Sequence, residues 1–304
     1  MALGEYEILD DRFPFCVSTS ARVERLHQGS IWAEGPVYFP AHRSLVWSDI
    51  PNERLLRWDE ITGQVSVFSH RSDFTNGNTV DRQGRLVSCQ QGTRRVVRRE
   101  HDGSLTVLAD RFEGQRLNSP NDVVVRSDDS IWFTDPRYGI DSYFEGYRAE
   151  SDIGADNVYR LDPQSGECRI VCDDFRRPNG LAFSPDESKL YIVESGGIRY
   201  PENPRHLRVF DVQPDGALSG GEIFAQCTVG KFDGLRVDES GRLWISAGDG
   251  VHCYEPDGTL IGKILLPEPV SNLVFGGPRR NRLYITATSS LYTVLLAVRG
   301  AAVF

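Results

Sequence analysis

The sequence predicts an all-β fold, a six-bladed β-propeller whose ring is closed by an N-terminal strand. Three observations lead to this prediction. A two-strand motif recurs along the chain, its copies are about one propeller blade apart, and the runs between copies alternate apolar and polar residues. The chain has 304 residues, and no linker rich in Pro, Gly or Ser divides it, so we expect residues 1–304 to form a single propeller domain.

Each copy of the motif begins with a polar residue, often followed by Gly, and continues as a strand, a turn and a second strand. The clearest copies are 34–49, 179–194 and 233–246, and weaker ones begin at residues 76, 121 and 272. Successive starts are 42, 45, 58, 54 and 39 residues apart. Each interval can therefore hold about four short strands with their turns, the size of one propeller blade.

The second halves of the units and the chain ends support a closed ring. The runs 55–68, 158–171 and 251–265 alternate and contain Gly turns, which is typical of β-hairpins. The last unit, 272 to about 298, is one strand short, while residues 5–18 precede the first unit. We therefore expect this N-terminal segment to supply the missing strand.

The third and fourth intervals are longer than the others. Their extra residues fall at about 137–156 and 196–205, in both cases after a second strand. Both segments should thus emerge on the same face of the ring. They could form a lid over a site there or be surface loops, and the sequence leaves both readings open.

Charge and composition indicate which partners and which cellular compartment to expect. A net charge of −9 argues against nucleic acid, because phosphate binding needs clustered cations, and we interpret the basic run 94–99 as a solvated strand face. No window approaches the roughly 18 apolar residues of a membrane span, and the N-terminus lacks a signal-peptide run. We expect a cytoplasmic protein with no membrane partner. Its six scattered cysteines predict free thiols.

The residues that start the six units are candidates for chemistry. In a propeller the innermost strands line the central channel, so side chains at one repeat position converge on the axis. All six carry a side-chain oxygen: Glu34, Asn76, Asn121, Asn179, Asp233 and Asn272. A turn at the start of each unit would explain the Asn-Gly and Asp-Gly pairs. It explains Glu34 poorly, because Glu is not a preferred turn residue, and it does not explain why all six positions carry an oxygen.

Two carboxylates converging in a channel need a cation between them. All-oxygen ligands favour a hard divalent ion, Ca²⁺ first and Mg²⁺ or Mn²⁺ next, with Zn²⁺ as a substitute. We therefore predict one divalent metal ion in the tunnel.

Five segments of the sequence resemble signature segments of the SMP-30/gluconolactonase/LRE-like family, most closely its bacterial and fungal gluconolactonase branch. The similarity runs from about residue 30 to residue 290. The segments are 32–36 (WAEGP), 118–122 (NSPND), 132–139 (WFTDPRYG), 177–181 (RPNGL) and 232–236 (FDGLR). This resemblance implies a six-bladed propeller with a catalytic Ca²⁺ or another divalent ion in its tunnel.

The resemblance also implies roles for individual residues. Glu34, Asn179 and Asp233 match the family's metal ligands, and Asn121 matches an Asn that binds the metal or the substrate beside it. Asp233 also matches the proposed general acid/base.

Sugar recognition is not carried over as simply. The substrate-binding Arg of the animal members is replaced by Ser119, and their substrate-binding Glu has no counterpart around Tyr138. The local candidates for substrate contact, besides Asn121, are therefore Ser119, Asp135 and Tyr138.

These parts predict a hydrolase that opens a small sugar lactone to the aldonic acid. A cation polarises the lactone carbonyl, and Asp233 moves the proton of the attacking water. Two alternatives remain open: a phosphotriesterase of the DFPase type, and a non-catalytic propeller that binds partners. The sequence does not indicate the oligomeric state.

Overall fold

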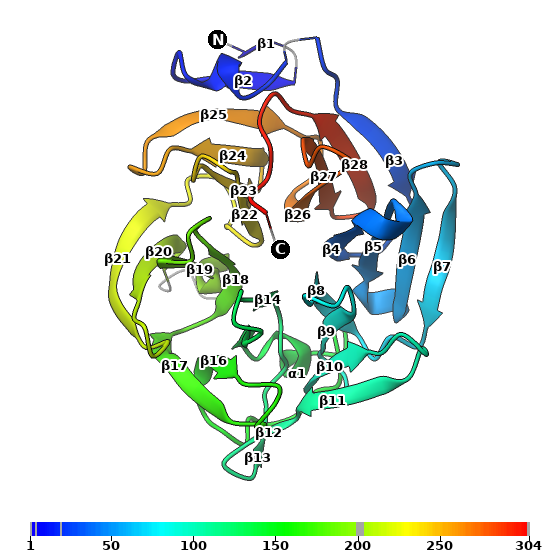
Figure 1. Cartoon of the computed structure of the whole chain (residues 1–304), viewed down its shortest axis with the longest axis vertical. Coiled ribbons are helices and arrows are strands. Elements are labelled where there is room, and N and C mark those ends of the chain that lie inside the picture. The colour runs from blue at the N-terminus through cyan, green and yellow to red at the C-terminus, as the bar shows by residue number, and fades with distance from the viewer. Residues whose placement is uncertain (1, 4, 19, 199–203, 303–304) are drawn as a thin grey trace.

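The computed structural model describes residues 2–3, 5–18, 20–198 and 204–302, and in these residues the strands form six blades arranged in a ring (Figure 1). In each blade the chain moves outward from the innermost strand through antiparallel neighbours, and N-terminal strands are added at the outside of blades five and six. The predicted six-bladed β-propeller is confirmed.

The first three blades follow the order of the chain from the inside outward. Blade one contains β4 (Ala33–Phe39), β5 (Ser44–Asp49), β6 (Arg54–Asp59) and β7 (Val65–His70). Blade two contains β8 (Thr75–Val80), β9 (Leu86–Gln90), β10 (Arg95–Arg99) and β11 (Leu105–Ala109). A hairpin of β12 (Arg111–Phe112) and β13 (Gln115–Arg116) then leads to blade three, which contains β14 (Val123–Val125), β15 (Ile131–Asp135), β16 (Asp156–Leu161) and β17 (Cys168–Phe175).

The other three blades complete the ring. Blade four contains β18 (Pro178–Phe183), β19 (Lys189–Glu194), β20 (His206–Val212) and β21 (Leu218–Gln226). Blade five contains β22 (Leu235–Val237), β23 (Leu243–Ala247), β24 (Gly250–Tyr254), β25 (Leu260–Leu265) and, outside them, β2 (Tyr6–Ile8) and β1 (Ala2–Leu3). Blade six contains β26 (Val270–Gly276), β27 (Arg282–Ala287), β28 (Ser290–Leu295) and β3 (Glu24–Gln28).

Helical segments are short and lie in the connections. They are the helix α1 (Tyr138–Asp141) and the 3₁₀ turns η1 (Phe13–Phe15), η2 (Pro40–His42), η3 (Ile50–Asn52) and η4 (Gly196–Ile198). Among the described residues, no helix is long and apolar enough to cross a membrane.

The core lies between the blades. The second strand of a blade packs on both faces against its neighbours, and every residue of β5, β15 and β23 is buried. An outer strand such as β11 instead alternates exposed and half-buried residues over most of its length. Burial on two faces accounts for the apolar runs of the second strands, and burial on one face accounts for the alternation further out.

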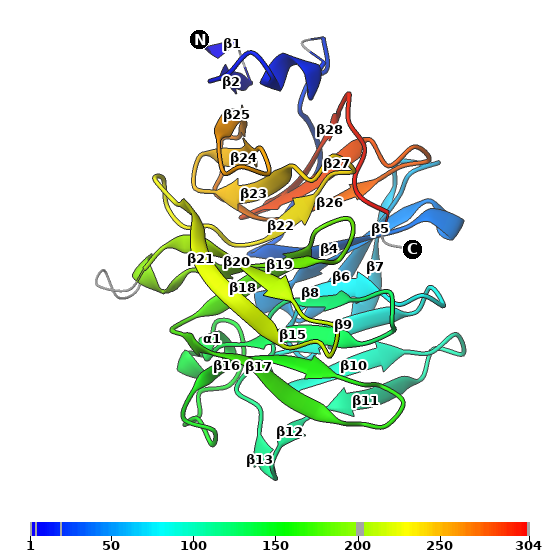
Figure 2. The same ribbon diagram turned by 60° about the vertical axis from the view of Figure 1, so that its left-hand side comes forward.

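Ring closure uses an N-terminal strand, but not the one that the sequence indicated. Glu24–Gln28 pairs antiparallel with β28, whereas Tyr6–Ile8 pairs with β25 of the neighbouring blade. Figure 2 shows β2 and the turn after it lying beyond β25 at the rim of the ring. The expectation that 5–18 closes the ring was wrong, because this segment instead covers blade five. There Phe13 is fully buried, with its ring centroid 6.3 Å from that of Trp244.

The direction of the innermost strands defines two mouths of the tunnel. The strand-start mouth is where these strands begin, around Glu34, Asn179 and Asp233. The strand-end mouth is where they finish, around Phe39 and Phe183. Because the second strand β15 runs antiparallel to the innermost strand β14, it ends at the face where β14 begins, and the segment 137–156 that follows it belongs to the strand-start mouth. Of the segment 196–205, residues 199–203 lie outside the described residues.

Candidate active site

Two acidic side chains form the centre of the strand-start mouth. Glu34 and Asp233 are each only 3% exposed. Burial raises the pKa of Glu34 well above its ordinary value, and the negative charge of Asp233 raises it further. The two carboxylates therefore lie close enough to repel each other, as convergence on the axis predicts.

The amide side chains around these carboxylates are held by hydrogen bonds. Asn272 Nδ2 donates to Glu34 Oε2 at 3.2 Å, and Asn179 Nδ2 donates to Ser195 Oγ at 2.8 Å. The Asn179 amide also hydrogen-bonds the Asp233 carboxylate. These bonds involve carboxylate and amide groups from four blades at the strand-start mouth.

Hydroxyl groups of the second strands position the backbone that carries these side chains. Ser48 Oγ donates to the carbonyl oxygen of Asn76 at 2.7 Å, and the Asp233 amide donates to Ser246 Oγ at 3.1 Å. Asn121 is buried, and its amide donates to the Thr134 carbonyl at 2.8 Å. These contacts with Ser48, Thr134 and Ser246 thus fix the backbone where three of the innermost strands begin.

The glycines that follow the repeat-start residues allow the blades to meet closely. A Cβ atom at Gly180 would lie 2.2 Å from the carbonyl oxygen of Asp233, and one at Gly35 would lie 2.1 Å from that of Asn76. The strand register also shifts just after Glu34. These Gly positions are therefore close contacts between blades at the axis and not hairpin turns, so turn chemistry does not account for them.

Lys231 is a site residue that the sequence reasoning missed. Its ammonium nitrogen lies 2.8 Å from Asp233 Oδ2 and 5.6 Å from the centre of the Tyr138 ring. The ring of Trp32 is 6.0 Å away on blade one. Lys231 precedes Asp233 by two residues, and alternation along an extended segment puts both side chains on one side. That spacing was the available signal.

Glu145 is a second missed residue. It lies half-buried in the inserted segment 137–156. Burial raises its pKa to about 7; the nearby Lys231 ammonium opposes this shift, and the charge of Asp233 adds to it. Nothing local in the sequence marks Glu145, because only the path of the inserted segment brings it over the tunnel.

Asp135 and Ser119, which the sequence offered as substrate contacts, are fully buried. Both carboxylate oxygens of Asp135 accept backbone amides, those of Asn118 and Ser119, at 2.8 Å each. Ser119 Oγ donates to the Pro136 carbonyl at 2.6 Å and accepts the Gly139 amide at 2.9 Å. This network holds the segment before Asn121 against α1. The substrate contacts predicted for both residues stay a prediction.

Tyr138, the remaining predicted substrate contact, lies at the strand-start mouth. It is half-buried and lies between two cations, with the Arg177 guanidinium 5.4 Å from its ring centre and the Lys231 ammonium 5.6 Å from it. Burial raises the pKa of its phenol to about 12, so the side chain is a neutral hydrogen-bonding group at physiological pH.

The donor set fits a hard divalent cation. In the described part of the chain, no group of three or more His, Cys, Asp and Glu side chains could hold a metal ion. The convergent groups are instead two mutually repelling carboxylates and neutral amides, contributed by Glu34, Asp233, Asn121 and Asn179. Oxygen donors of this kind suit Ca²⁺ or Mg²⁺ better than a metal that prefers nitrogen and sulfur.

Comparison with known proteins places this arrangement in a family. A family model described as the SMP-30/gluconolactonase/LRE-like region matches residues 32–289. The chain belongs to the SMP-30/gluconolactonase/LRE-like family. The matched region contains all six repeat-start residues.

Three relatives illustrate the similarity. The gluconolactonase of Zymomonas mobilis is 30% identical, over 96% of this chain and 86% of that protein. The pentonolactonase of Haloferax volcanii is 32% identical, over 83% of this chain and 80% of its own length. A solved structure of a gluconolactonase from Xanthomonas campestris is 39% identical with a TM-score of 0.90, covering 96% of this chain and 94% of that one. The similarity therefore extends along nearly the whole propeller.

Proposed function

We propose that this protein hydrolyses a sugar lactone to the corresponding aldonic acid and that it needs a divalent metal ion to do so. The observation that carries the proposal is the convergence of Glu34 and Asp233 with asparagine amides at the strand-start mouth. Membership of the family and the lactonases among its relatives support the choice of a lactone as substrate.

Four residues would hold the ion: Glu34, Asn121, Asn179 and Asp233. A divalent cation bound there supplies Lewis acidity that polarises the lactone carbonyl and stabilises the negative charge that develops on it. Glu34 and Asp233 supply the negative charge that such an ion neutralises, and Ser195 keeps the Asn179 amide turned toward the site.

Asp233 is the group that moves the proton. Its carboxylate accepts the proton of the attacking water and returns it to the ring oxygen as the ester bond breaks. The contact with Lys231 at 2.8 Å fixes one carboxylate oxygen, so the other oxygen is the one that faces water. Water attacks the lactone carbonyl directly, so the reaction forms no covalent bond between Asp233 and the substrate.

The rim of the mouth is suited to a polyhydroxylated ring. Trp32 and Tyr138 supply flat apolar surfaces on two sides of Lys231, and Glu145 supplies an acceptor for hydroxyl groups. Apolar walls with a few placed polar groups are the general composition of small-molecule sites. We assign substrate recognition to these residues together with Asn121.

Lactone hydrolysis can be measured directly. Protein stripped with a chelator and reloaded with Ca²⁺ is expected to release acid from glucono-1,5-lactone and from a pentonolactone faster than the spontaneous reaction. The stripped protein should be inactive. A parallel assay with an organophosphate triester tests the other hydrolase chemistry, and faster turnover of the triester would replace the lactone in this proposal. If the Ca²⁺-loaded protein hydrolysed none of these substrates, the proposed function would be wrong.

A further inference from the structure

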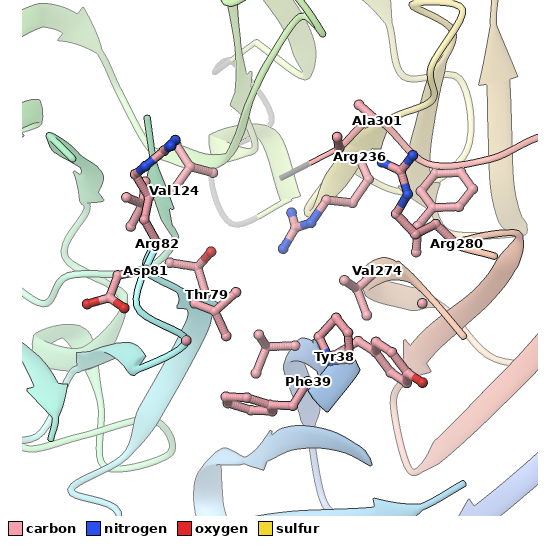
Figure 3. Close-up of a pocket in the computed structure, with 18 of the residues that line it drawn as sticks. Tyr38, Phe39, Thr79, Asp81, Arg82, Val124, Arg236, Val274, Arg280 and Ala301 are labelled. Atoms are coloured by element: carbon pink, nitrogen blue, oxygen red, sulfur yellow. The ribbon is translucent and has the colours of Figure 1, made fainter. Parts of the chain in front are cut away.

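The strand-end mouth contains a cavity of about 550 Å³ that is separate from the site described above. The ends of the innermost strands line it, and Figure 3 shows their side chains around the open space. None of the six repeat-start residues belongs to this lining. Its volume is in the range of pockets that take small organic molecules.

The walls of this cavity are mainly apolar. Val37, Val124 and Val274 line it from three blades, and the rings of Phe39, Phe183 and Phe275 also contribute. A ligand that fills the space would therefore bury a hydrocarbon body against these side chains.

Arginine side chains add positive charge to this apolar cavity. Arg82, Arg236 and Arg280 all line it, and Figure 3 shows the Arg236 guanidinium reaching into the open space. Arg236 Nη1 donates to the Leu235 carbonyl at 2.7 Å. Arg280 Nη1 is buried and, among the described residues, has no hydrogen-bond partner. This buried guanidinium nitrogen needs a hydrogen-bond acceptor, and a bound ligand can supply one.

The carboxylates in the lining are committed to other partners. Asp81 accepts from Arg85 Nε at 2.7 Å, and Figure 3 shows its carboxylate turned away from the cavity. Glu187 accepts the Ser127 amide at 2.8 Å and lies 3.5 Å from Arg126 Nε. Neither carboxylate pairs with Arg236 or Arg280; the carboxylate near Arg236 is that of Asp122, which is outside the lining. The lining itself therefore has an excess of positive charge, with the three arginines against Asp81 and Glu187.

A packed layer separates this cavity from the strand-start mouth. Asn78 Nδ2 fills the axis by donating to the Gly35 carbonyl, Ser48 Oγ and the Asn76 carbonyl at 2.9, 2.9 and 3.0 Å. Asp122 is buried in the same layer, between the charges of Asp233 and Arg236. The two mouths are therefore two distinct sites, and a ligand of one does not occupy the other.

We propose that the strand-end mouth is a binding site for a small organic anion, with a hydrocarbon body in the apolar cavity and a carboxylate or phosphate head on Arg236 and Arg280. Guanidinium groups bind both head groups through charge-assisted hydrogen bonds. The site is independent of the lactone chemistry, because it shares no residue with it.

Calorimetric titration of the full chain tests this site with four probes of one chain length: octanoate, octyl phosphate, octanol and octyltrimethylammonium. We expect one equivalent of octanoate or octyl phosphate to bind, and the tighter of the two identifies the preferred head group. The double variant Arg236→Gln/Arg280→Gln should weaken that binding by about tenfold or more. Octanol and octyltrimethylammonium should bind more weakly than either anion.

The matched control is Arg279→Gln, which removes an exposed arginine of the same turn that is outside the cavity lining. This variant should bind the anion like the wild type. A further variant, Val274→Trp, fills the cavity without changing charge and should also weaken binding. Absence of anion binding, equal binding of octanol, or an unchanged affinity in the double variant would each overturn the proposal.

Discussion

At the strand-start mouth the chain presents Glu34, Asn179 and Asp233, whereas at the strand-end mouth the same segments finish among Phe39, Phe183 and Arg236. Only two residues separate Asp233 from Arg236, yet one lies at an acidic, oxygen-rich site and the other at an apolar cavity lined by arginines. The comparison teaches that the two ends of one short innermost strand can contribute to sites of opposite chemistry. The packed layer around Asn78 lies between the two mouths.

Asp233→Asn should separate the two mouths most strongly. The variant loses the carboxylate that we assign to proton transfer, so kcat for lactone hydrolysis should fall by about 10²–10⁴-fold. Octanoate binding at the other mouth should not change. Steady-state kinetics, calorimetry and circular dichroism check these outcomes.

The control for this variant is Glu239→Gln, which removes an exposed acid a few residues further along the chain. It should keep wild-type kcat. A kcat of Asp233→Asn within about tenfold of wild type would exclude the proton-transfer role.

Removal of the divalent ion should also affect the two mouths differently. Without a cation, Glu34 and Asp233 repel each other in a buried site, so chelation should abolish lactonase activity and lower Tm. For an ion present at about 100 times its Kd, the lost stabilisation is about 2.7 kcal/mol, or on the order of 5 °C. Differential scanning calorimetry with and without EDTA measures the shift, and Ca²⁺ should restore it. Confirmed metal removal with unchanged activity and unchanged Tm would show that the strand-start mouth needs no ion.

Asp135→Asn should reduce stability and leave the strand-end mouth intact. An Asn oxygen can accept one of the two backbone amides, and its NH₂ group then faces the other, so the free energy of unfolding should fall by about 1–3 kcal/mol. Urea denaturation measures this change, with the exposed Asp110→Asn as the matched control. If Asp135→Asn raised KM without any loss of stability, Asp135 would contact substrate after all.

Glu145→Gln should have the smallest effect, confined to recognition at the strand-start mouth. The amide accepts hydrogen bonds more weakly than the carboxylate, so KM for a six-carbon sugar lactone should rise several-fold, on the order of 1 kcal/mol. KM for an unsubstituted lactone should stay constant. Glu150→Gln, an exposed acid in the same segment, is the control. Equal increases of KM on both substrates would indicate that Glu145 supports the fold of the segment and does not read the sugar.

The sequence predicted those parts of this molecule that repeat. Equivalent positions of equivalent blades must converge in a closed ring, so Glu34 and Asp233 could be placed together from spacing alone. Closure could not be assigned to the correct segment, because outer strands pack on one face and carry weak patterns. Residues 24–28 and 6–8 are both short strands of this kind.

Contacts of residues that repetition does not govern could not be predicted from the sequence. Asp135 ends the buried strand β15, and backbone amides use both of its oxygens, a network that depends on the path of the chain. Glu145 reaches the tunnel through an insertion in one blade. The cavity at the strand-end mouth combines residues of several blades without any motif, so Arg236 gave no signal as part of an ordinary alternating strand.

The closing strand has a consequence for how the protein is made. Residues 24–28 pair with residues 290–293, so the last blade requires contacts between segments that are far apart in the chain. Contacts of such long range are slow to form, because the entropy of closing the loop must first be overcome. Glu34 follows this strand closely, and its neighbour Asn272 comes from the same last blade. A chain emerging from the ribosome therefore carries Glu34 early, but the strand-start mouth is complete only when the last blade, which supplies Asn272, has been synthesised and has closed the ring.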